Sequence, residues 1–327
     1  MASQSTSSKE REHSEYLNLL ARVAHLYYEQ GFNQREIAQQ IERHPSTISR
    51  LLEEARNEGI VRITVHYPWQ SDMQLAEQLQ NKFQLKAARV LLSNDLSYSQ
   101  MIDGLGILAA RLLISCLRDE YIVGISWGSA VYSTIQAIHV AGPISITAVQ
   151  MCGAAGGSLI GGVELPRLVA EKLGGTYRYL PAPIVVKDAG LTQSLLNEPP
   201  VLETLSLANR ADVALVGIGA TDPRISQWLR AGYADSFEVL DLVNAGYVGD
   251  VCGRFFTEEG RLLSEDAERD LDARLIAVTP ASLRKIDRVI GVAGGDVKVR
   301  AIRGALSAGL INVLVTDSAA AVRLLSD

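Results

Sequence analysis

Apolar residues recur every three or four positions through the first sixty residues of the chain, a spacing that predicts helices with one buried face. The first of these helices ends at Gly31, where the apolar pattern stops. Its apolar stripe consists of Leu17, Leu20, Ala21, Ala24, Tyr27 and Tyr28. Residues 1–11 lack this spacing and are rich in Ser, Gln, Lys and Glu, a composition that is typical of a disordered tail.

Two shorter amphipathic runs follow the first helix. Asn33 can cap a second helix, because Glu36 stands three residues later in the capping-box position. The buried side of this helix consists of Ile37, Ala38 and Ile41. Pro45 suits the first position of a third helix, which ends at Gly59. Its inner face consists of Ile48, Leu51, Leu52 and Ala55.

A short strand or wing is expected next, because residues 60–66 alternate with a period of two. Three helices and a wing predict a winged helix-turn-helix over residues 12–67, whose third helix enters the DNA major groove with its first residues at the base edges. Arg50 suits a bidentate contact to guanine. The DNA-binding candidates are Arg43, His44, Ser46, Thr47, Ser49 and Arg50, with Gln34 and Arg35 placed to touch the DNA backbone.

The charge of this segment bears on the DNA-binding interpretation. The first sixty residues hold nine Glu against seven Lys plus Arg, so the net positive charge expected of a DNA-binding domain is missing. The charges are nevertheless sorted, because three glutamates lie late in the third helix while Arg35, Arg43 and Arg50 lie at or before its groove-entering end. A three-helix protein-interaction module stays an alternative. Modest DNA affinity per subunit would be offset by several heads in one homo-oligomer, which we therefore expect.

The pattern changes near Pro68. Residues 71–85 predict a connecting helix, and "AARVLLS" after it predicts a strand. Further strands are predicted from short runs rich in Val and Ile at Tyr121–Ile125, Ile144–Met151, Val213–Ile218, Val289–Ala293 and Val313–Thr316. Helical segments separate these runs, and such alternation predicts a parallel sheet covered by helices on both faces. We therefore expect a Rossmann-like α/β effector-binding domain over residues 68–327, with ligands at the carboxyl ends of the strands.

Four of the predicted strands end in glycine-rich loops, "SWGS", "CGAAGG", "GIGAT" and "GGDVK". Glycines let backbone N–H groups approach an anion, and a helix N-terminus adds a partial positive charge. Lys298 would add a full charge. These loops predict an anionic metabolite, most simply a sugar phosphate. The effector-binding candidates in them are Ser126, Trp127, Gly128, Ser129, Cys152, Gly153, Gly217, Gly219, Gly294, Gly295 and Lys298.

Several other classes are excluded by the sequence. The chain has 327 residues, a formal charge of −6 and 47% hydrophobic residues, which suits a globular protein of two or three domains. Its three cysteines match neither a disulfide framework nor metal-ligand spacing. No Rossmann fingerprint or Walker motif occurs, so no nucleotide cofactor is expected. The polar N-terminus and the Arg111 interruption of the longest apolar stretch indicate a cytoplasmic protein without a membrane partner.

Six segments in the same order resemble the SorC family of bacterial sugar-responsive transcriptional regulators, and in particular its deoxyribonucleoside regulator type. They are "ARVAHLYYEQGFNQREIAQQIERHPSTISRLLEEARNEGIVRITV", "VGISWGSAVY", "RYLPAP", "VALVGIG", "VGDVCGRFF" and "VAGGDVKVRAIRGAL". The resemblance implies a DNA-binding head on an effector domain similar to sugar-phosphate isomerases and glucosamine-phosphate deaminases, usually assembled as tetramers. It also implies that a phosphorylated sugar binds the effector domain and weakens operator binding.

The resemblance carries ligand contacts over to this chain. They are Ser126, Gly128, Ser129, Asp250, Arg254, Gly294, Gly295 and Lys298, with Asp250 accepting hydrogen bonds from sugar hydroxyls. Two positions depart from the family. His44 stands where many relatives have a small N-cap residue, and Cys152 stands where some carry a basic or hydroxyl residue, so that loop cannot form an imine with the effector.

Structural alternatives stay open for several candidates. Trp127 either stacks on a sugar or fills the gap between sheet and helix, and Cys152 is either a reactive thiol or a small buried residue. Asp250 can also cap a turn, and Arg254 can be a surface charge.

The alternative function is a sugar-phosphate isomerase or aminosugar-phosphate deaminase, with Asp250 or Glu164 as general base. No carboxylate–histidine group accompanies the glycine loops, so we expect a regulator and no enzyme. Repression relieved by ligand is the expected mode, and activation stays an alternative.

Overall fold

The structure is a computed structural model that describes residues 3–61, 69–154, 164–230, 232, 236–266 and 271–326. The chain divides into two compact units, Met1–Pro68 and Trp69–Asp327, one residue from the predicted boundary. Each unit has a hydrophobic core of its own.

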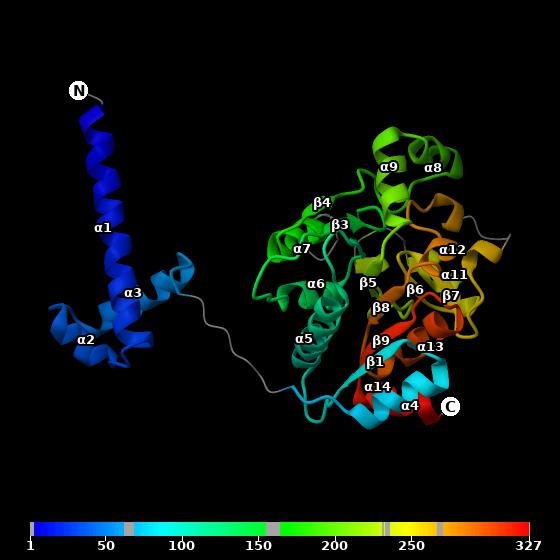
Figure 1. Ribbon diagram of the computed structural model, residues 1–327, viewed down its shortest axis with the longest axis horizontal. Coiled ribbons are helices and arrows are strands. Elements are labelled where there is room, and N and C mark those ends of the chain that lie inside the picture. The colour runs from blue at the N-terminus through cyan, green and yellow to red at the C-terminus, as the bar shows by residue number, and fades with distance from the viewer. Residues whose placement is uncertain are drawn as a thin grey trace. The chain divides into compact units, whose positions relative to one another are not determined.

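The described residues of the N-terminal unit form three helices, drawn in blue in Figure 1. They are α1 (Ser3–Tyr28), α2 (Gln34–Gln40) and α3 (Pro45–Asn57). The capping box of α2 forms as predicted, because Asn33 Oδ1 accepts from Glu36 N at 3.1 Å and Glu36 Oε2 accepts from Asn33 N at 2.8 Å. Pro45 occupies the first turn of α3, also as predicted. The predicted wing falls mostly on residues 62–68, which lie outside the described residues.

The core of this unit lies where α1 packs against α2 and α3. It consists of Leu20, Val23, Ala24, Leu26, Ile37, Ala38, Ile48, Leu51, Leu52 and Ala55. The inner face of α3 is therefore confirmed. The predicted stripe of α1 is partly wrong, because Ala21 and Tyr28 are exposed while Val23 and Leu26 are buried. A helix that contacts two neighbours buries a wider face than a single stripe.

The prediction of a disordered tail is also wrong for the described part of residues 1–11, since α1 begins at Ser3. Gln, Lys and Glu are good helix formers and Ser costs only a few tenths of a kcal/mol more, roughly. A helix that is already nucleated by its packed end can therefore extend through a polar segment without an apolar stripe.

The second unit is built on a seven-stranded parallel sheet with the strand order β1-β9-β8-β5-β2-β3-β4. The strands are β1 (Ala87–Leu91), β2 (Ile122–Ile125), β3 (Thr147–Gln150), β4 (Thr176–Arg178), β5 (Val213–Gly217), β8 (Arg288–Val292) and β9 (Val313–Asp317). The six predicted strands are confirmed. The sequence pattern does not predict β4, because this edge strand has three residues, all exposed, and no apolar run marks it.

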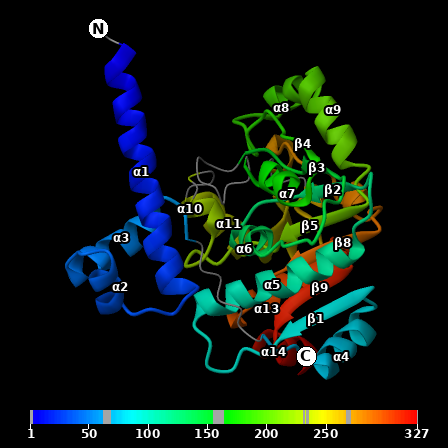
Figure 2. The same ribbon diagram turned by 60° about the vertical axis from the view of Figure 1, so that its left-hand side comes forward.

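Helices cover both faces of the sheet, as Figure 2 shows. One face packs against α5 (Tyr98–Cys116), α6 (Ser129–Gln136) and α7 (Leu165–Leu173). The other packs against α4 (Met73–Phe83), α9 (Pro199–Ala208), α13 (Val299–Ser307) and α14 (Ser318–Ser326). By length and composition alone α5 would suffice to cross a membrane, but half of this stretch is buried inside the fold, as in many core helices.

An antiparallel hairpin of β6 (Tyr247–Val251) and β7 (Arg254–Thr257) lies apart from the main sheet and packs against α13. Its turn residues Cys252 and Gly253 have φ of 53° and 81°, so both adopt the left-handed conformation of a two-residue hairpin turn. The hairpin is not predicted from the sequence, because Cys is unusual at the first turn position. The remaining elements are α8 (Ala189–Leu196), α10 (Gln227–Arg230), α11 (Ser236–Asn244), α12 (Pro280–Leu283), η2 (Leu263–Glu265), η3 (Leu271–Arg274) and η4 (Asp296–Lys298).

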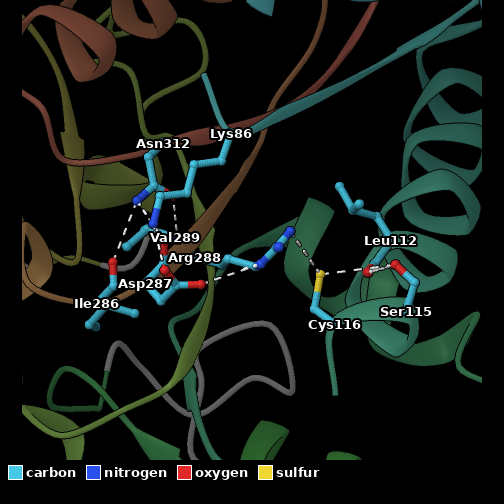
Figure 3. Close-up of polar contacts among 9 residues, drawn as sticks. All are labelled: Lys86, Leu112, Ser115, Cys116, Ile286, Asp287, Arg288, Val289 and Asn312. Carbon is cyan, nitrogen blue, oxygen red and sulfur yellow. Dashed lines mark hydrogen bonds and ion pairs between the residues drawn. The ribbon is translucent and has the colours of Figure 1, made fainter. Parts of the chain in front are cut away.

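The amino ends of β1, β8 and β9 are held together by polar side chains, shown in Figure 3. Asn312 Nδ2 donates to the Asp287 carbonyl at 3.0 Å, and Lys86 forms an ion pair with the Asp287 carboxylate at 2.6 Å. Arg288 Nη1 donates to Cys116 Sγ at 3.7 Å. These polar groups bind one another and join strands, so this edge of the sheet serves the fold.

Candidate functional site

A cavity of about 520 Å³ opens at the carboxyl ends of β2, β5 and β8. The chain runs from β2 to β3 and β4 on one side, and from β5 to β8 and β9 on the other, so β2 and β5 flank the reversal of strand order. Open α/β sheets bind ligands at this point. We call this cavity the switch-point cavity. Its lining includes most of the predicted effector-binding candidates, namely Ser126, Trp127, Gly128, Ser129, Gly217, Gly219, Asp250, Gly294 and Lys298.

Lys298 supplies a cation to the cavity from the end of η4, just before α13. Its Nζ donates to the Ile218 carbonyl at 2.8 Å, which fixes the ammonium beside the end of β5. Burial lowers the pKa of Lys298 to about 8, against the opposing effect of the Asp250 charge. An anion in the cavity would favour the charged form of this amine.

Asp250 supplies a buried carboxylate from β6, and it is only 5% exposed. Its Oδ2 accepts from Gly253 N at 3.0 Å, as in a capped turn. Burial raises the pKa of Asp250, while hydrogen bonds from Gly253 and Trp228 and the charge of Lys298 lower it. Gly219 N donates to the Asp250 carbonyl at 2.8 Å, and a Cβ on Gly219 would collide with Asp250 Oδ1. The glycine of this loop is therefore needed for the close approach of the hairpin.

The "SWGS" loop joins β2 to α6 at the reversal point. Ser126 Oγ accepts from Gly217 N at 3.1 Å and so connects the ends of β2 and β5. Gly128 has φ 129°, and no atom lies within 4 Å of the place where a Cβ would be. Ser129 begins α6, whose N-terminal backbone N–H groups and partial positive charge suit an anion.

Trp127 both lines the cavity and fills space behind it. It is half-buried and packs against the hydrophobic clusters on both faces of the sheet. Its ring meets Trp228 edge to face, with the centroids 6.2 Å apart. The packing role proposed for Trp127 is therefore present, and the residue also belongs to the cavity lining.

Arg254 does not reach the cavity, and the structure contradicts its prediction as a ligand contact. Its Nε donates to the Val278 carbonyl at 3.0 Å, and its Nη1 pairs with Asp272 Oδ2 at 3.0 Å. The side chain is buried, so it is not a surface charge either. Its cross-strand partner is Val251, the neighbour of Asp250, and successive residues of a strand face opposite sides. Arg254 therefore points away from the side on which Asp250 meets the cavity.

The "CGAAGG" loop also contributes less than predicted. Among the described residues, neither Cys152 nor Gly153 belongs to the cavity lining. Cys152 is 1% exposed, and the neighbouring Cys252 thiol together with burial raises the pKa of Cys152, so its thiol stays protonated. A Cβ on Gly153 would collide with the Pro183 backbone. Both residues are used for packing, and residues 155–163 of this loop lie outside the described residues.

Gly295 lies next to the cavity but outside its lining. Its backbone N donates to Asp317 Oδ1 at 2.6 Å, and its φ of 87° suits glycine. Its neighbour Gly294 does line the cavity. Gly295 therefore shapes the start of η4, which carries Lys298 into place.

The polar residues of the cavity wall that the sequence did not predict include an arginine and a tyrosine. Arg230, at the end of α10, lines the cavity, and its positive charge contributes to the lowered pKa of Lys298. Tyr98, the first residue of α5, lines it too. Neither residue is adjacent to a glycine loop in the sequence, so no local signal indicates its position.

The DNA-binding candidates lie on and around α3 in the N-terminal unit. Arg35, Arg43, His44, Ser46, Ser49 and Arg50 are exposed, and Gln34 and Thr47 are half-buried. His44 is the N-cap of α3 and its Nδ1 accepts from Ser46 N at 3.3 Å, so the family departure at this position still caps the helix. The Arg50 side chain is 70% exposed on the face opposite the buried Ile48 and Leu51.

Comparisons with known proteins agree on both units. A family described as "Putative sugar-binding domain" matches residues 67–326, and a "Helix-turn-helix domain" family matches residues 21–55. The transcriptional regulator LsrR of Klebsiella pneumoniae subsp. pneumoniae is 33% identical, over 94% of this chain and 93% of its own length. The deoxyribonucleoside regulator of Bacillus subtilis is 31% identical, over 93% of this chain and 96% of its own.

A solved structure covers both units as well. The full-length sorbitol operon regulator SorC of Klebsiella pneumoniae matches with a TM-score of 0.72 and 30% identity. The match covers 94% of this chain and 98% of that one. These proteins are transcriptional regulators, so the isomerase and deaminase alternatives are not supported.

Proposed function

Because the chain belongs to the SorC family of sugar-binding transcriptional regulators, we propose that a phosphorylated sugar in the switch-point cavity controls its binding to operator DNA. In this proposal α3 reads the operator, and the second unit binds the effector and assembles the homo-oligomer. The regulator works on DNA in the cytoplasm of a bacterial cell. Repression relieved by the effector is the expected mode.

The charge arrangement of the cavity is the observation that carries the effector proposal. Lys298 and Arg230 bring two cations to a cavity that also receives the N-terminus of α6. A phosphate group suits such a place, because it accepts several charge-assisted hydrogen bonds at once. Asp250 provides acceptors for sugar hydroxyls in the same cavity. Asp250 can balance only one of the two cations, so a neutral sugar would leave a net positive charge in the lining and a phosphorylated ligand fits better.

Control of DNA binding requires that the effector prefer one arrangement of the oligomer over another. A hundredfold preference corresponds to roughly 2.7 kcal/mol per site, within the usual range of allosteric coupling. Two elements lining the cavity, the β6–β7 hairpin and the η4–α13 segment, belong to different parts of the chain. A ligand bridging Asp250 and Lys298 would therefore favour the arrangement that brings these elements together.

Two substitutions test the division of labour. Lys298→Ala should abolish the thermal stabilisation given by pentose, deoxypentose, hexose or polyol phosphates, and should leave duplex binding intact.

Arg50→Ala should weaken specific duplex binding by about 1 to 3 kcal/mol if Arg50 contacts a base, and should keep the ligand-induced thermal shift. The exposed Lys285→Ala is the matched control for loss of one positive charge. Equal loss of both activities in both variants would contradict the proposal.

A further inference from the structure

We propose that Tyr16 and Glu54 position the Arg50 guanidinium to read a base, an inference that rests on the DNA-binding role proposed above for α3. The Tyr16 hydroxyl, on α1, donates to Glu54 Oε2 on α3. The other carboxylate oxygen, Glu54 Oε1, lies 3.7 Å from Arg50 Nε, one turn earlier on the same helix. One carboxylate thus links the candidate base-reading residue to the helix that packs against α3.

The position of Glu54 decides which edge of the guanidinium is free. A guanidinium can form paired hydrogen bonds through Nη1 and Nη2 at its end, or through Nε and one Nη at its side. Glu54 Oε1 lies 3.7 Å from Nε and therefore faces the side edge of Arg50. Among the described residues the end edge has no such neighbour, and it offers two parallel N–H bonds that match N7 and O6 of guanine. The 70% exposure of the Arg50 side chain keeps this end accessible.

The charge of Glu54 favours a base over the DNA backbone. A carboxylate beside Arg50 repels phosphates and cancels part of the arginine charge, so it weakens sequence-independent contacts. It does not oppose a hydrogen bond from Arg50 to a base edge in the same way. Glu54 should therefore lower affinity for any duplex while raising the preference for one sequence.

Tyr16 restrains Glu54 from a different helix. The Glu54 side chain is 35% exposed, and without a partner it would sample several rotamers. The hydrogen bond to Glu54 raises the pKa of Tyr16, so the phenol keeps its proton and stays a donor at neutral pH. Arg50 is therefore partly ordered before DNA binds. Such preorganisation lowers the side-chain entropy that is lost on binding.

Specificity can be measured without knowing the natural operator. The full-length wild-type chain first selects a duplex from a pool with a randomised central sequence. Each variant is then titrated against that duplex and against a scrambled duplex, and the specificity ratio is the quotient of the two dissociation constants. Circular dichroism melting checks that each variant folds.

Glu54→Gln should bind the scrambled duplex more tightly and lose at least about fivefold in the specificity ratio, a part of what a bidentate arginine–guanine contact supplies. Tyr16→Phe changes no charge and should lose a smaller part of the ratio. The double variant should be no worse than Glu54→Gln, because Tyr16 acts through Glu54. The control is Glu53→Gln, an exposed carboxylate on the same turn, which should keep the ratio.

Wild-type ratios in both Tyr16→Phe and Glu54→Gln would overturn the positioning role while leaving the DNA-binding proposal intact. The same would follow if Glu53→Gln and Glu54→Gln changed the two dissociation constants equally, since charge alone would then explain the effect. A wild-type chain that selects no sequence from the pool would overturn the DNA-reading role of α3, and the inference with it.

Discussion

Single residues give the cavity its chemistry, and two of them are charged groups held away from bulk water. Asp250 and Lys298 lie in the same cavity. Burial raises the pKa of Asp250 and lowers that of Lys298, so it favours the neutral form of both. Arg254, four residues from Asp250, is equally buried but binds carbonyl groups and Asp272 on the other side of the hairpin. Which buried charge is available to a ligand therefore depends on the side of the strand that carries it.

The pKa of Lys298 predicts how effector binding depends on pH. A phosphate ester is already a dianion above about pH 7, because its second pKa is about 6. Lys298 loses its proton around pH 8 in the free protein, so affinity should fall between pH 7 and 9 and approach a tenfold loss per pH unit above 8. Titration calorimetry of a bound sugar phosphate measures this dependence. Lys298→Arg stays charged and should flatten the profile, and an unchanged profile would assign the titration to another group.

The free energy of unfolding of the ligand-free protein should also depend on pH through Lys298. Its change with pH has the opposite sign to the change in effector affinity. In the unfolded chain a lysine keeps its proton up to about pH 10.4. Between about pH 8 and that value the unfolded state holds more protons than the folded state, because the folded pKa of Lys298 is lowered. The contribution of Lys298 to the free energy of unfolding therefore rises with pH in this window, while affinity for an anion falls.

At the scale of elements, the β6–β7 hairpin connects the cavity to the body of the second unit. Its turn carries Gly253, which binds Asp250, and its second strand begins with Arg254, which binds the segment before α12. The hairpin meets α13, and η4 with Lys298 directly precedes that helix. Asp250 and Lys298 thus belong to neighbouring elements that are far apart in sequence.

Arg254→Met tests the structural role of this arginine. The substitution leaves three carbonyl groups and the Asp272 carboxylate without this donor, so we expect a loss of roughly 3 to 5 kcal/mol in the free energy of unfolding. Urea unfolding measures it. The exposed Arg300→Met, which removes an ion pair with Glu258, should change it by no more than about 1 kcal/mol. Weaker effector binding at unchanged stability would instead restore Arg254 as a ligand contact.

At the scale of the whole molecule, two units with separate cores divide recognition between them. The cores of the second unit draw only on residues from Trp69 onward, and the core of the first ends at Val61. The lining of the switch-point cavity comes from Tyr98 onward among the described residues, so we expect effector binding to depend on the second unit. The deficit of positive charge in the first sixty residues makes each DNA-binding unit weak by itself, so joined copies would gain from avidity.

A fragment of residues 69–327 should bind the effector with the dissociation constant of the full chain, within about twofold, because additivity holds for independent sites. Its affinity for the selected duplex should disappear. Calorimetry and fluorescence anisotropy measure the two quantities, and sedimentation analysis shows whether the fragment keeps the assembly state of the full chain. A large change in effector affinity would mean that the first unit contributes to the cavity.

Local signals determined much of this protein from sequence alone. The Asn33–Glu36 capping box, Pro45 at the start of α3 and the six Val- and Ile-rich strands are confirmed, because each depends on residues close together in the chain. The glycine loops after β2, β5 and β8 also indicated the cavity, since parallel strands bring their carboxyl ends to one edge.

Only the tertiary structure decided what depends on distant contacts. The sequence did not reveal that Arg230 faces the cavity or that Arg254 turns away from it. For Cys152 it left two interpretations, and the structure supports the small buried residue. The sequence also missed β4 and the hairpin, which have no apolar run or standard turn signal. Segments far apart in sequence pack together to set the hairpin register, the placement of the helices and the hydrogen bond from Tyr16 to Glu54. The residue pattern of one segment does not show which other segment it will contact.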